Sequence, residues 1–261
     1  YGSPKAGTAS VHGSPLGQDG LAATKAALGY ADVPEFTVPE EVKAHAHRAI
    51  SRGRKAERNW KKMMKAYREA YPELAAEFDA WYGKKLPDLI NDKDLWEFAK
   101  PDATRNTSYG VLNKLASRVP QLIGGSADLT PSNLSDMKDT ENNVYGEFSA
   151  NNFAGRNIHF GIREHAMAAM ANGMQLHGGI HAYCSTFFVF SDYCKPAMRL
   201  SALMKLPVVY VMTHDSIGVG EDGPTHQPVE QLIMLRSIPG LKVYRPADGK
   251  ETAAAWVSAL S

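Results

Sequence analysis

The sequence predicts an α/β protein whose parallel sheet is flanked by helices. Helical and strand patterns alternate through residues 101–261, and such alternation produces βα units with helices on both faces of a sheet. The run Pro207-Val-Val-Tyr-Val-Met212 is apolar and rich in β-branched residues, which is typical of a buried parallel strand. A loop rich in titratable residues follows directly, at the end of the strand where open α/β sheets place their ligands.

The spacing of apolar residues defines the expected elements of this region one by one. In chain order they are a helix over Thr104–Ala116, a strand over Gln121–Ser126, a helix over Ile162–Leu176, a strand over Ile180–Cys184, a helix over Thr186–Leu203, a strand over 207–213, a helix from Val229, a strand over Leu241–Tyr244 and a last helix over Gly249–Ser261. No internal repeat is visible in the sequence.

Two further zones precede the α/β region. Residues 1–36 are rich in Gly, Ser, Ala and Pro, with one helical pattern near Gly20–Leu28, and resemble the tail of a domain. Residues 37–100 are polar and helical, and Thr37 with Glu40 predicts a capping box at their start. The chain begins without Met and stops inside a helical pattern, so we expect a fragment of a longer polypeptide.

The composition is that of an ordinary globular protein. Of 261 residues, 44% are hydrophobic and 22% charged, and the net charge is +1; no electrostatic field therefore favours nucleic acid or an acidic membrane. No apolar run approaches the length of a membrane span. Cys184 and Cys194 lie among apolar residues, which predicts buried thiols, with a redox pair as the alternative, and a cytoplasmic location.

The loop over residues 213–228 predicts an active site. It reads Thr213-His-Asp-Ser-Ile-Gly-Val-Gly-Glu-Asp-Gly-Pro-Thr-His-Gln-Pro228, with two histidines and three acids held among glycines and prolines, whereas a plain surface loop favours Ser, Asn and Lys. The same stretch contains a G-x-G-x-x-G pattern, which elsewhere marks dinucleotide binding. We reject that interpretation, because Glu221 and Asp222 would repel a pyrophosphate and the first glycine follows the strand too late.

Glu164 is the second candidate. It lies in the first turn of a helix that is apolar almost all round, which predicts a buried helix and a desolvated carboxylate. Such a charge needs a partner. The partner is either Arg163 or His165 in a structural ion pair, or a basic nitrogen of a ligand.

Several segments together resemble the transketolase family in order and spacing. They are Gly124-Gly-Ser-Ala-Asp-Leu-Thr-Pro-Ser-Asn133, Phe160-Gly-Ile-Arg-Glu-His165, Thr186-Phe-Phe-Val-Phe-Ser-Asp-Tyr193, the 213–228 loop, Tyr244-Arg-Pro-Ala-Asp248 and, less specifically, Ser10-Val-His-Gly13. The resemblance covers essentially the whole chain. It implies the end of a diphosphate-binding domain over residues 1–36, a helical connector over 37–100 and a truncated pyrimidine-binding domain over 101–261.

The resemblance implies transfer of a two-carbon ketol unit between sugar phosphates with thiamine diphosphate. Another thiamine-dependent ketol transferase, such as dihydroxyacetone synthase or phosphoketolase, is the alternative within enzymes, and a non-catalytic module is the alternative outside them. The family works as a homodimer with active sites at the subunit interface. Its Mg²⁺ or Ca²⁺ ligands, a Gly-Asp-Gly…Asn motif, are absent from this sequence, so we expect this chain alone to be inactive.

The resemblance also implies roles for individual residues. Glu164, His12 and His226 match catalytic groups, and Glu164 matches the acid that hydrogen-bonds the cofactor aminopyrimidine. The cofactor pocket is matched by Phe187, Phe190, Tyr193, His12 and Asp128, although for the three aromatic side chains packing in the core is the alternative. Residues matching the family's sugar-phosphate contacts are Arg105, Ser132, His214, Asp222, His226 and His12.

Overall fold

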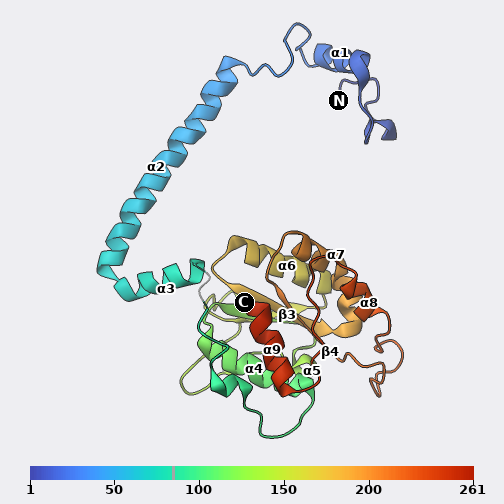
Figure 1. The fold of residues 1–261 in the computed structure, drawn as a ribbon. Helices are drawn as coiled ribbons and strands as arrows, with labels where there is room; N and C mark the ends of the chain where they lie inside the picture. Colours follow the sequence, from blue (N-terminus) through green and yellow to red (C-terminus); the bar gives the residue numbers. More distant parts are fainter. Residues whose placement is uncertain (84–85) are drawn as a thin grey trace. The chain divides into compact units, whose positions relative to one another are not determined.

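The computed structural model describes residues 1–83 and 86–261, which form two compact units, Tyr1–Tyr71 and Pro72–Ser261 (Figure 1). The first unit contains a 3-10 turn η1 (Ala9–Val11), helix α1 (Gly17–Ala27) and the long helix α2 (Glu40–Ala70). The helical pattern near Gly20–Leu28 is therefore confirmed, with its start three residues earlier. Most of α2 is exposed to solvent.

The predicted capping box is wrong. Helix α2 begins at Glu40 with Pro39 as its N-cap residue, and no side chain caps it. A capping box would require Thr37 as N-cap and Val38 in helical conformation. The ring of a following proline disfavours that conformation, so Val38 stays outside the helix, and α2 begins after Pro39.

The second unit contains a four-stranded sheet in which all neighbouring strands run parallel. Its strands are β1 (Leu122–Ala127), β2 (Asn157–Gly161), β3 (His181–Phe187) and β4 (Val209–Thr213), in the order β2-β1-β3-β4. The predicted α/β class with a parallel sheet and flanking helices is confirmed.

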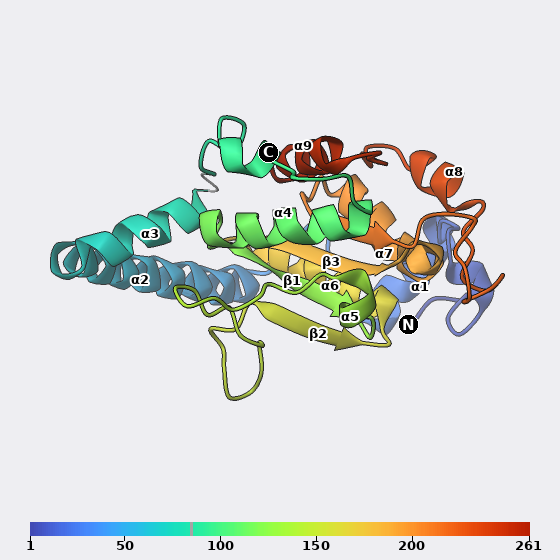
Figure 2. The ribbon, with the colours of Figure 1, turned by 90° about the horizontal axis from the view of Figure 1, so that it is seen from below.

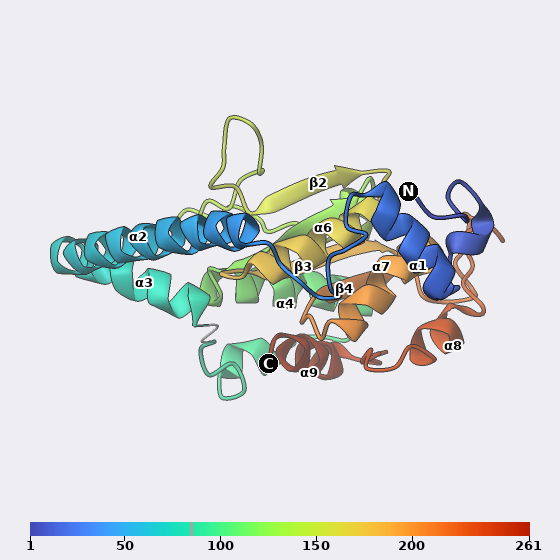
Figure 3. The same ribbon diagram turned by 90° about the horizontal axis from the view of Figure 1, so that it is seen from above.

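Helices cover both faces of this sheet (Figures 2 and 3). On one face, α4 (Thr104–Arg118) packs against α9 (Gly249–Leu260), and together they bury a core that includes Leu115, Tyr183 and Trp256. On the other face, α6 (Glu164–His177) packs against α7 (Ser191–Leu203) over Met167 and Cys184. The remaining elements of this unit are α3 (Pro72–Tyr82), η2 (Lys93–Trp96), α5 (Thr130–Asn133), η3 (Phe188–Phe190) and α8 (Gln231–Arg236).

Two strand assignments differ from the sequence patterns. The predicted strand over Leu241–Tyr244 is wrong: that segment makes no ladder among the described residues, and a strand exists only where a neighbour supplies its hydrogen bonds. Strand β2 was not predicted. It follows a long irregular stretch and is partly exposed, so its five residues carry only a weak periodic signal.

Arg156 ties the edge of the sheet to the end of helix α4. Its guanidinium donates to the carbonyl oxygens of Leu122 at 2.8 Å, of Ala116 at 2.9 Å and of Val119 at 2.9 Å, and it lies 4.9 Å from the ring centre of Tyr145. Carbonyls at the end of a helix have no partner within the helix. Arg156 therefore replaces water for three carbonyls in a partly buried position.

We expect Arg156→Met to lower the free energy of unfolding by about 1–3 kcal/mol, because the carbonyls lose their donor while the apolar stem is kept. Urea unfolding followed by circular dichroism measures the change. Arg199→Met is the matched control, since Arg199 is exposed on α7. Equal unfolding midpoints for the two variants would show that the three hydrogen bonds contribute nothing.

Candidate active site

The predicted site residues of the second unit gather where the parallel strands end. Phe187 is the last residue of β3, and His214 follows the last residue of β4. Ser132 lies on α5, just after the end of β1. Because the carboxyl ends of parallel strands meet at one edge of a sheet, residues far apart in the sequence come together here.

An aromatic platform, made of Phe187, Phe190 and Tyr193, extends from the end of β3 into α7. The rings of Phe187 and Phe190 are stacked with centres 5.8 Å apart and planes 2° apart. Tyr193 follows at 5.9 Å from Phe190 and is 61% exposed. Exposure of its outer ring distinguishes the platform from an ordinary core, so a planar ligand can be stacked there.

Two histidines of the 213–228 loop lie against this platform. The His214 ring is stacked on Phe187 with centres 3.8 Å apart. The His226 ring meets Phe190 edge-on at 5.3 Å and Phe187 at 5.9 Å. The loop therefore brings both imidazoles to the aromatic side chains, as a site built from several strand ends requires.

A set of polar groups lies beside His214. Arg105 donates from Nη1 to the carbonyl oxygen of Ser132 at 3.1 Å and lies 3.4 Å from Nε2 of His214. Arg245 donates from Nε to Asp215 Oδ2 at 2.8 Å. The guanidinium pair, Arg105 and Arg245, lines one cavity of about 860 Å³ along β4, together with His214 and Asp215.

Arg245 was missed as a site residue from the sequence. Its segment, Tyr244-Arg-Pro-Ala-Asp248, contributed to the resemblance, but nothing local assigns a role to the arginine. Its ion pair connects it to Asp215, which lies 30 residues earlier in the 213–228 loop.

The surroundings of His214 lower its pKa and so favour the neutral imidazole. Burial, followed by the neighbouring Arg105 guanidinium, lowers the pKa of His214, while the carboxylates of Asp222 and Asp215 act in the opposite direction. His214 also has a left-handed backbone, with φ of 55°, which is uncommon outside glycine. A neutral imidazole in a strained conformation is typical of functional sites.

Glu164 begins helix α6, but the prediction that this helix is buried is wrong for this chain. Met170 and Leu176 on α6 are 52% and 59% exposed, so the apolar pattern marks a face without a partner here. Among the described residues, the Glu164 carboxylate has no hydrogen bond or ion pair, and the Arg163 guanidinium donates to the Phe160 carbonyl instead. The structural ion pair with Arg163 or His165 is therefore not formed.

Glu164 lies close to the aromatic platform through the packing of α6 on α7. The Cys194 thiol, one residue beyond Tyr193, lies 3.5 Å from the Glu164 carbonyl oxygen. An unpaired carboxylate at the start of a helix, beside a partly exposed aromatic surface, fits a planar ligand that carries a basic ring nitrogen.

Three further predicted residues, Asp128, Asp222 and His12, are exposed to solvent. Asp128 is exposed in the turn after β1, and Asp222 is exposed in the 213–228 loop. His12 belongs to the first unit, where it follows η1 and is exposed. His226 has its Nδ1 2.9 Å from the hydroxyl of Thr225.

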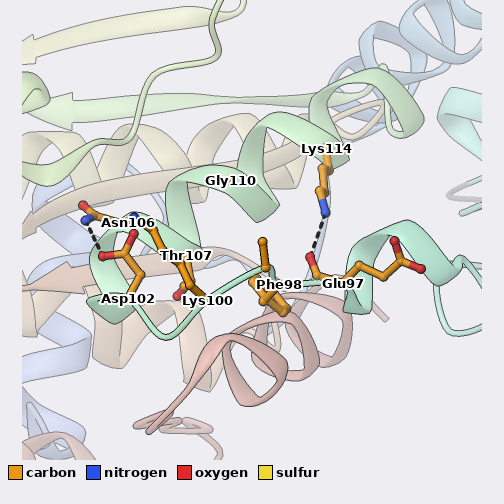
Figure 4. Close-up of a pocket in the computed structure, with 9 residues that line it drawn as sticks. Glu97, Phe98, Lys100, Asp102, Asn106, Thr107, Gly110 and Lys114 are labelled. Atoms are coloured by element: carbon orange, nitrogen blue, oxygen red, sulfur yellow. Dashed lines mark hydrogen bonds between the residues drawn. The ribbon is translucent and has the colours of Figure 1, made fainter.

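A second, smaller cavity of about 230 Å³ lies between residues 97–102 and helix α4 (Figure 4). Lys114 reaches into it and donates to the Glu97 carbonyl at 3.4 Å, and Asn106 donates to Asp102 at 2.8 Å. None of the predicted site residues lines it. Its polar groups already bond to each other, so we assign it no function.

Within the described ranges 1–83 and 86–261, no group of His, Cys, Asp or Glu side chains has the arrangement of a metal site. In the same ranges, no helix is long and apolar enough to cross a membrane.

The fold and the site define an α/β ligand-binding domain with an aromatic platform next to a guanidinium pair. Residues 100–261 match the family model "Transketolase, pyrimidine binding domain", and residues 1–87 match "Transketolase, thiamine diphosphate binding domain". The chain belongs to the transketolase family.

Individual relatives agree with this assignment. Transketolases of Geobacillus stearothermophilus and Halalkalibacterium halodurans are 51% and 50% identical to the chain over 263 and 264 residues. Among solved structures, the transketolase of Leishmania mexicana has a TM-score of 0.91 at 42% identity, covering 100% of this chain and 38% of that one. A Pichia stipitis transketolase in complex with sedoheptulose-7-phosphate has a TM-score of 0.89 at 42% identity, covering 100% of this chain and 39% of that one. The chain spans 39% of the length of the two bacterial relatives.

Proposed function

We propose that this chain contributes part of the active site of a transketolase, which transfers a two-carbon ketol unit from a ketose phosphate to an aldose phosphate with thiamine diphosphate. The observation that carries the proposal is the unpaired carboxylate of Glu164, whose helix packs on α7 next to the aromatic platform. The family assignment supports it. Because the chain spans 39% of its relatives, other segments supply the rest of each site, including the ligands of Mg²⁺ or Ca²⁺.

Glu164 and the aromatic platform are suited to hold the aminopyrimidine of the cofactor. When bound, thiamine diphosphate supplies a carbon nucleophile for attack on the ketose carbonyl. Glu164 holds a proton that it shares with the ring nitrogen N1′, and it has no competing partner among the described residues. Phe187, Phe190 and Tyr193 offer stacking surfaces and keep water away from the ring. Asp128, in the turn after β1, borders this pocket.

Histidines and an acid of the site would act on the sugar. His226 and His12 are imidazoles suited to move protons at the reacting oxygens near neutral pH. Asp222 accepts a hydrogen bond from a sugar hydroxyl and thereby selects one stereochemistry. His214 contacts the donor sugar next to Phe187, where its Nε2 can accept a hydrogen bond from a hydroxyl.

The terminal phosphate of the sugar would bind at Arg105, Arg245 and Ser132. The guanidinium pair faces one cavity, and a guanidinium fork matches the geometry of phosphate oxygens. The Ser132 hydroxyl is half-buried beside Arg105 and adds a donor.

We further propose a homodimer whose partner covers the exposed apolar face of α6. Ile162, Met170 and Leu176 are each more than half exposed on or next to that helix, and large exposed apolar side chains rimmed by polar residues mark interfaces. The active sites would lie at this interface. Two free, buried thiols support a reducing, cytoplasmic location.

Arg105→Ala tests the assignment of the phosphate site. In the full-length enzyme that contains this chain, it is expected to raise KM for phosphorylated donors roughly 10–150-fold, because a lost charge-assisted contact costs about 1.5–3 kcal/mol. KM for hydroxypyruvate, which has no phosphate, is expected to change little. The measurement is steady-state kinetics with both donors, and Arg199→Ala on α7 is the control. Equal damage with both donors would identify Arg105 as a structural residue.

A further inference from the structure

A continuous chain of hydrogen bonds connects the guanidinium of Arg105 to the interior of the sheet. From Arg105 Nη1 it passes through the imidazole of His214, the hydroxyl of Thr213, the amide of Asn133 and the hydroxyl of Ser126 to the carbonyl oxygen of Ser185. It joins α4, the end of β4, α5, β1 and β3. We name these groups the Ser126–His214 relay.

The chemistry of the end groups determines the direction of every bond in the relay. A guanidinium can only donate, so Nε2 of His214, 3.4 Å from Arg105 Nη1, must accept. At the other end, the Ser185 carbonyl can only accept, and it does so from the Ser126 hydroxyl at 3.0 Å. Ser126 in turn accepts from the Asn133 amide nitrogen at 2.7 Å.

The hydrogen bonds in the middle of the relay have directions that agree with those fixed at its two ends. The Thr213 hydroxyl donates to Asn133 Oδ1 at 2.5 Å, which leaves its oxygen lone pairs free to accept. The nitrogen Nδ1 of His214 lies 2.9 Å from that hydroxyl. Since the hydroxyl hydrogen is already used, Nδ1 must carry the proton and donate it to Thr213.

Because the inner groups of the relay are buried, the direction of its hydrogen bonds is hard to reverse. Asn133 is 1% exposed and Ser126 is fully buried, so water cannot satisfy them if the chain breaks, and an unpaired buried polar group costs free energy. The groups around His214 are Arg105 on α4, Asp215, Asp222 and His226 in the loop, and the stacked ring of Phe187. A second proton on Nε2 would point directly at the Arg105 guanidinium.

We propose that Thr213 and Asn133 are positioning residues that hold His214 as its Nδ1–H tautomer, so that Nε2 remains an acceptor that orients Arg105. The significance of Arg105 for phosphorylated sugars depends on the proposed function. The tautomer of His214 does not, because it follows from contacts within this chain alone.

The chain contains its own matched control for this idea. The dipeptide Thr-His occurs twice in the 213–228 loop, and in both copies the threonine hydroxyl lies 2.9 Å from Nδ1 of the histidine. The Thr213 hydroxyl also donates to the buried Asn133. Thr225 is exposed and has no further hydrogen bond among the described residues. The same local pair therefore occurs with and without a relay behind it.

The test is ¹⁵N NMR of the full-length enzyme that contains this chain, with labelled histidine, without substrate, at a pH at which His214 is neutral. His214 is assigned by its loss in His214→Gln. The expected spectrum has a pyrrole-type Nδ1 and a pyridine-type Nε2 for His214. A pyridine-type Nδ1 in the unmodified chain would overturn the proposal without any variant.

Variants then test which residues hold the tautomer. Thr213→Val keeps the shape of the side chain and removes the acceptor, and it is expected to change the tautomer ratio of His214 by roughly five- to tenfold, the equivalent of one hydrogen bond. Thr213→Ser is expected to restore the original ratio, and Thr225→Val to leave it unchanged. An unaltered ratio in a folded Thr213→Val chain would show that Thr213 does not position His214. Because no activity is measured, the result is separate from the kinetic test of Arg105.

Discussion

Glu164→Gln is expected to lower kcat about 10²–10⁴-fold in the full-length enzyme while the fold survives, since this is the usual contribution of a general acid–base group. Glutamine keeps the size and shape of the side chain but cannot share a proton with a ring nitrogen in the same way. The effect should be large because the Glu164 carboxylate has no structural partner among the described residues, so its removal breaks no ion pair.

The measurement is ketol transfer at saturating thiamine diphosphate and Mg²⁺, together with the thermal midpoint of each variant. Glu230→Gln is the matched control, because Glu230 is an exposed glutamate at the N-cap of α8 and so also lies at the start of a helix. Near-native turnover of Glu164→Gln under these conditions would contradict the assignment. A loss of turnover accompanied by a large drop in the thermal midpoint would instead assign Glu164 to stability.

Asp222→Ala is expected to reduce the enzyme's preference for donors with the correct hydroxyl configuration by as much as about 10⁴-fold. A site built to bond a hydroxyl rejects a ligand that leaves its polar group unpaired, and alanine removes that group. Asp222 lies in the 213–228 loop, close enough to His214 to act on its pKa. It is therefore near the place where the sugar would meet the platform.

The comparison uses kcat/KM for a D-threo ketose phosphate, its epimer and hydroxypyruvate. Hydroxypyruvate lacks the stereocentre and should be affected least. Glu221→Ala is the control, because this neighbouring acid is exposed in the same loop and has no proposed role. Constant ratios among the three donors in Asp222→Ala would indicate that this residue shapes the loop and does not contact the sugar.

Local patterns in the sequence were sufficient for the class of fold and for the position of the 213–228 loop at the end of a strand. The apolar run before Thr213 predicted a buried strand; β4 confirms the strand, although its three middle residues are only half-buried. A parallel strand ends where ligands bind, so the loop carrying His214 and His226 could be assigned to a site before any contact was known. The family followed from the order and spacing of the motifs, because residue types at fixed offsets are properties of the chain itself.

The tertiary structure decided what depends on partners distant in the sequence. Strand β2 exists because β1 pairs with it, and Leu241–Tyr244 is not a strand because no neighbour within residues 1–83 and 86–261 supplies a ladder. The ion pair of Arg245 with Asp215 and the relay from Ser126 to His214 join segments far apart in the chain. The periodicity of a segment reports which face is apolar, but not what covers that face, and for this reason the exposed side of α6 could not be distinguished from a buried one by sequence.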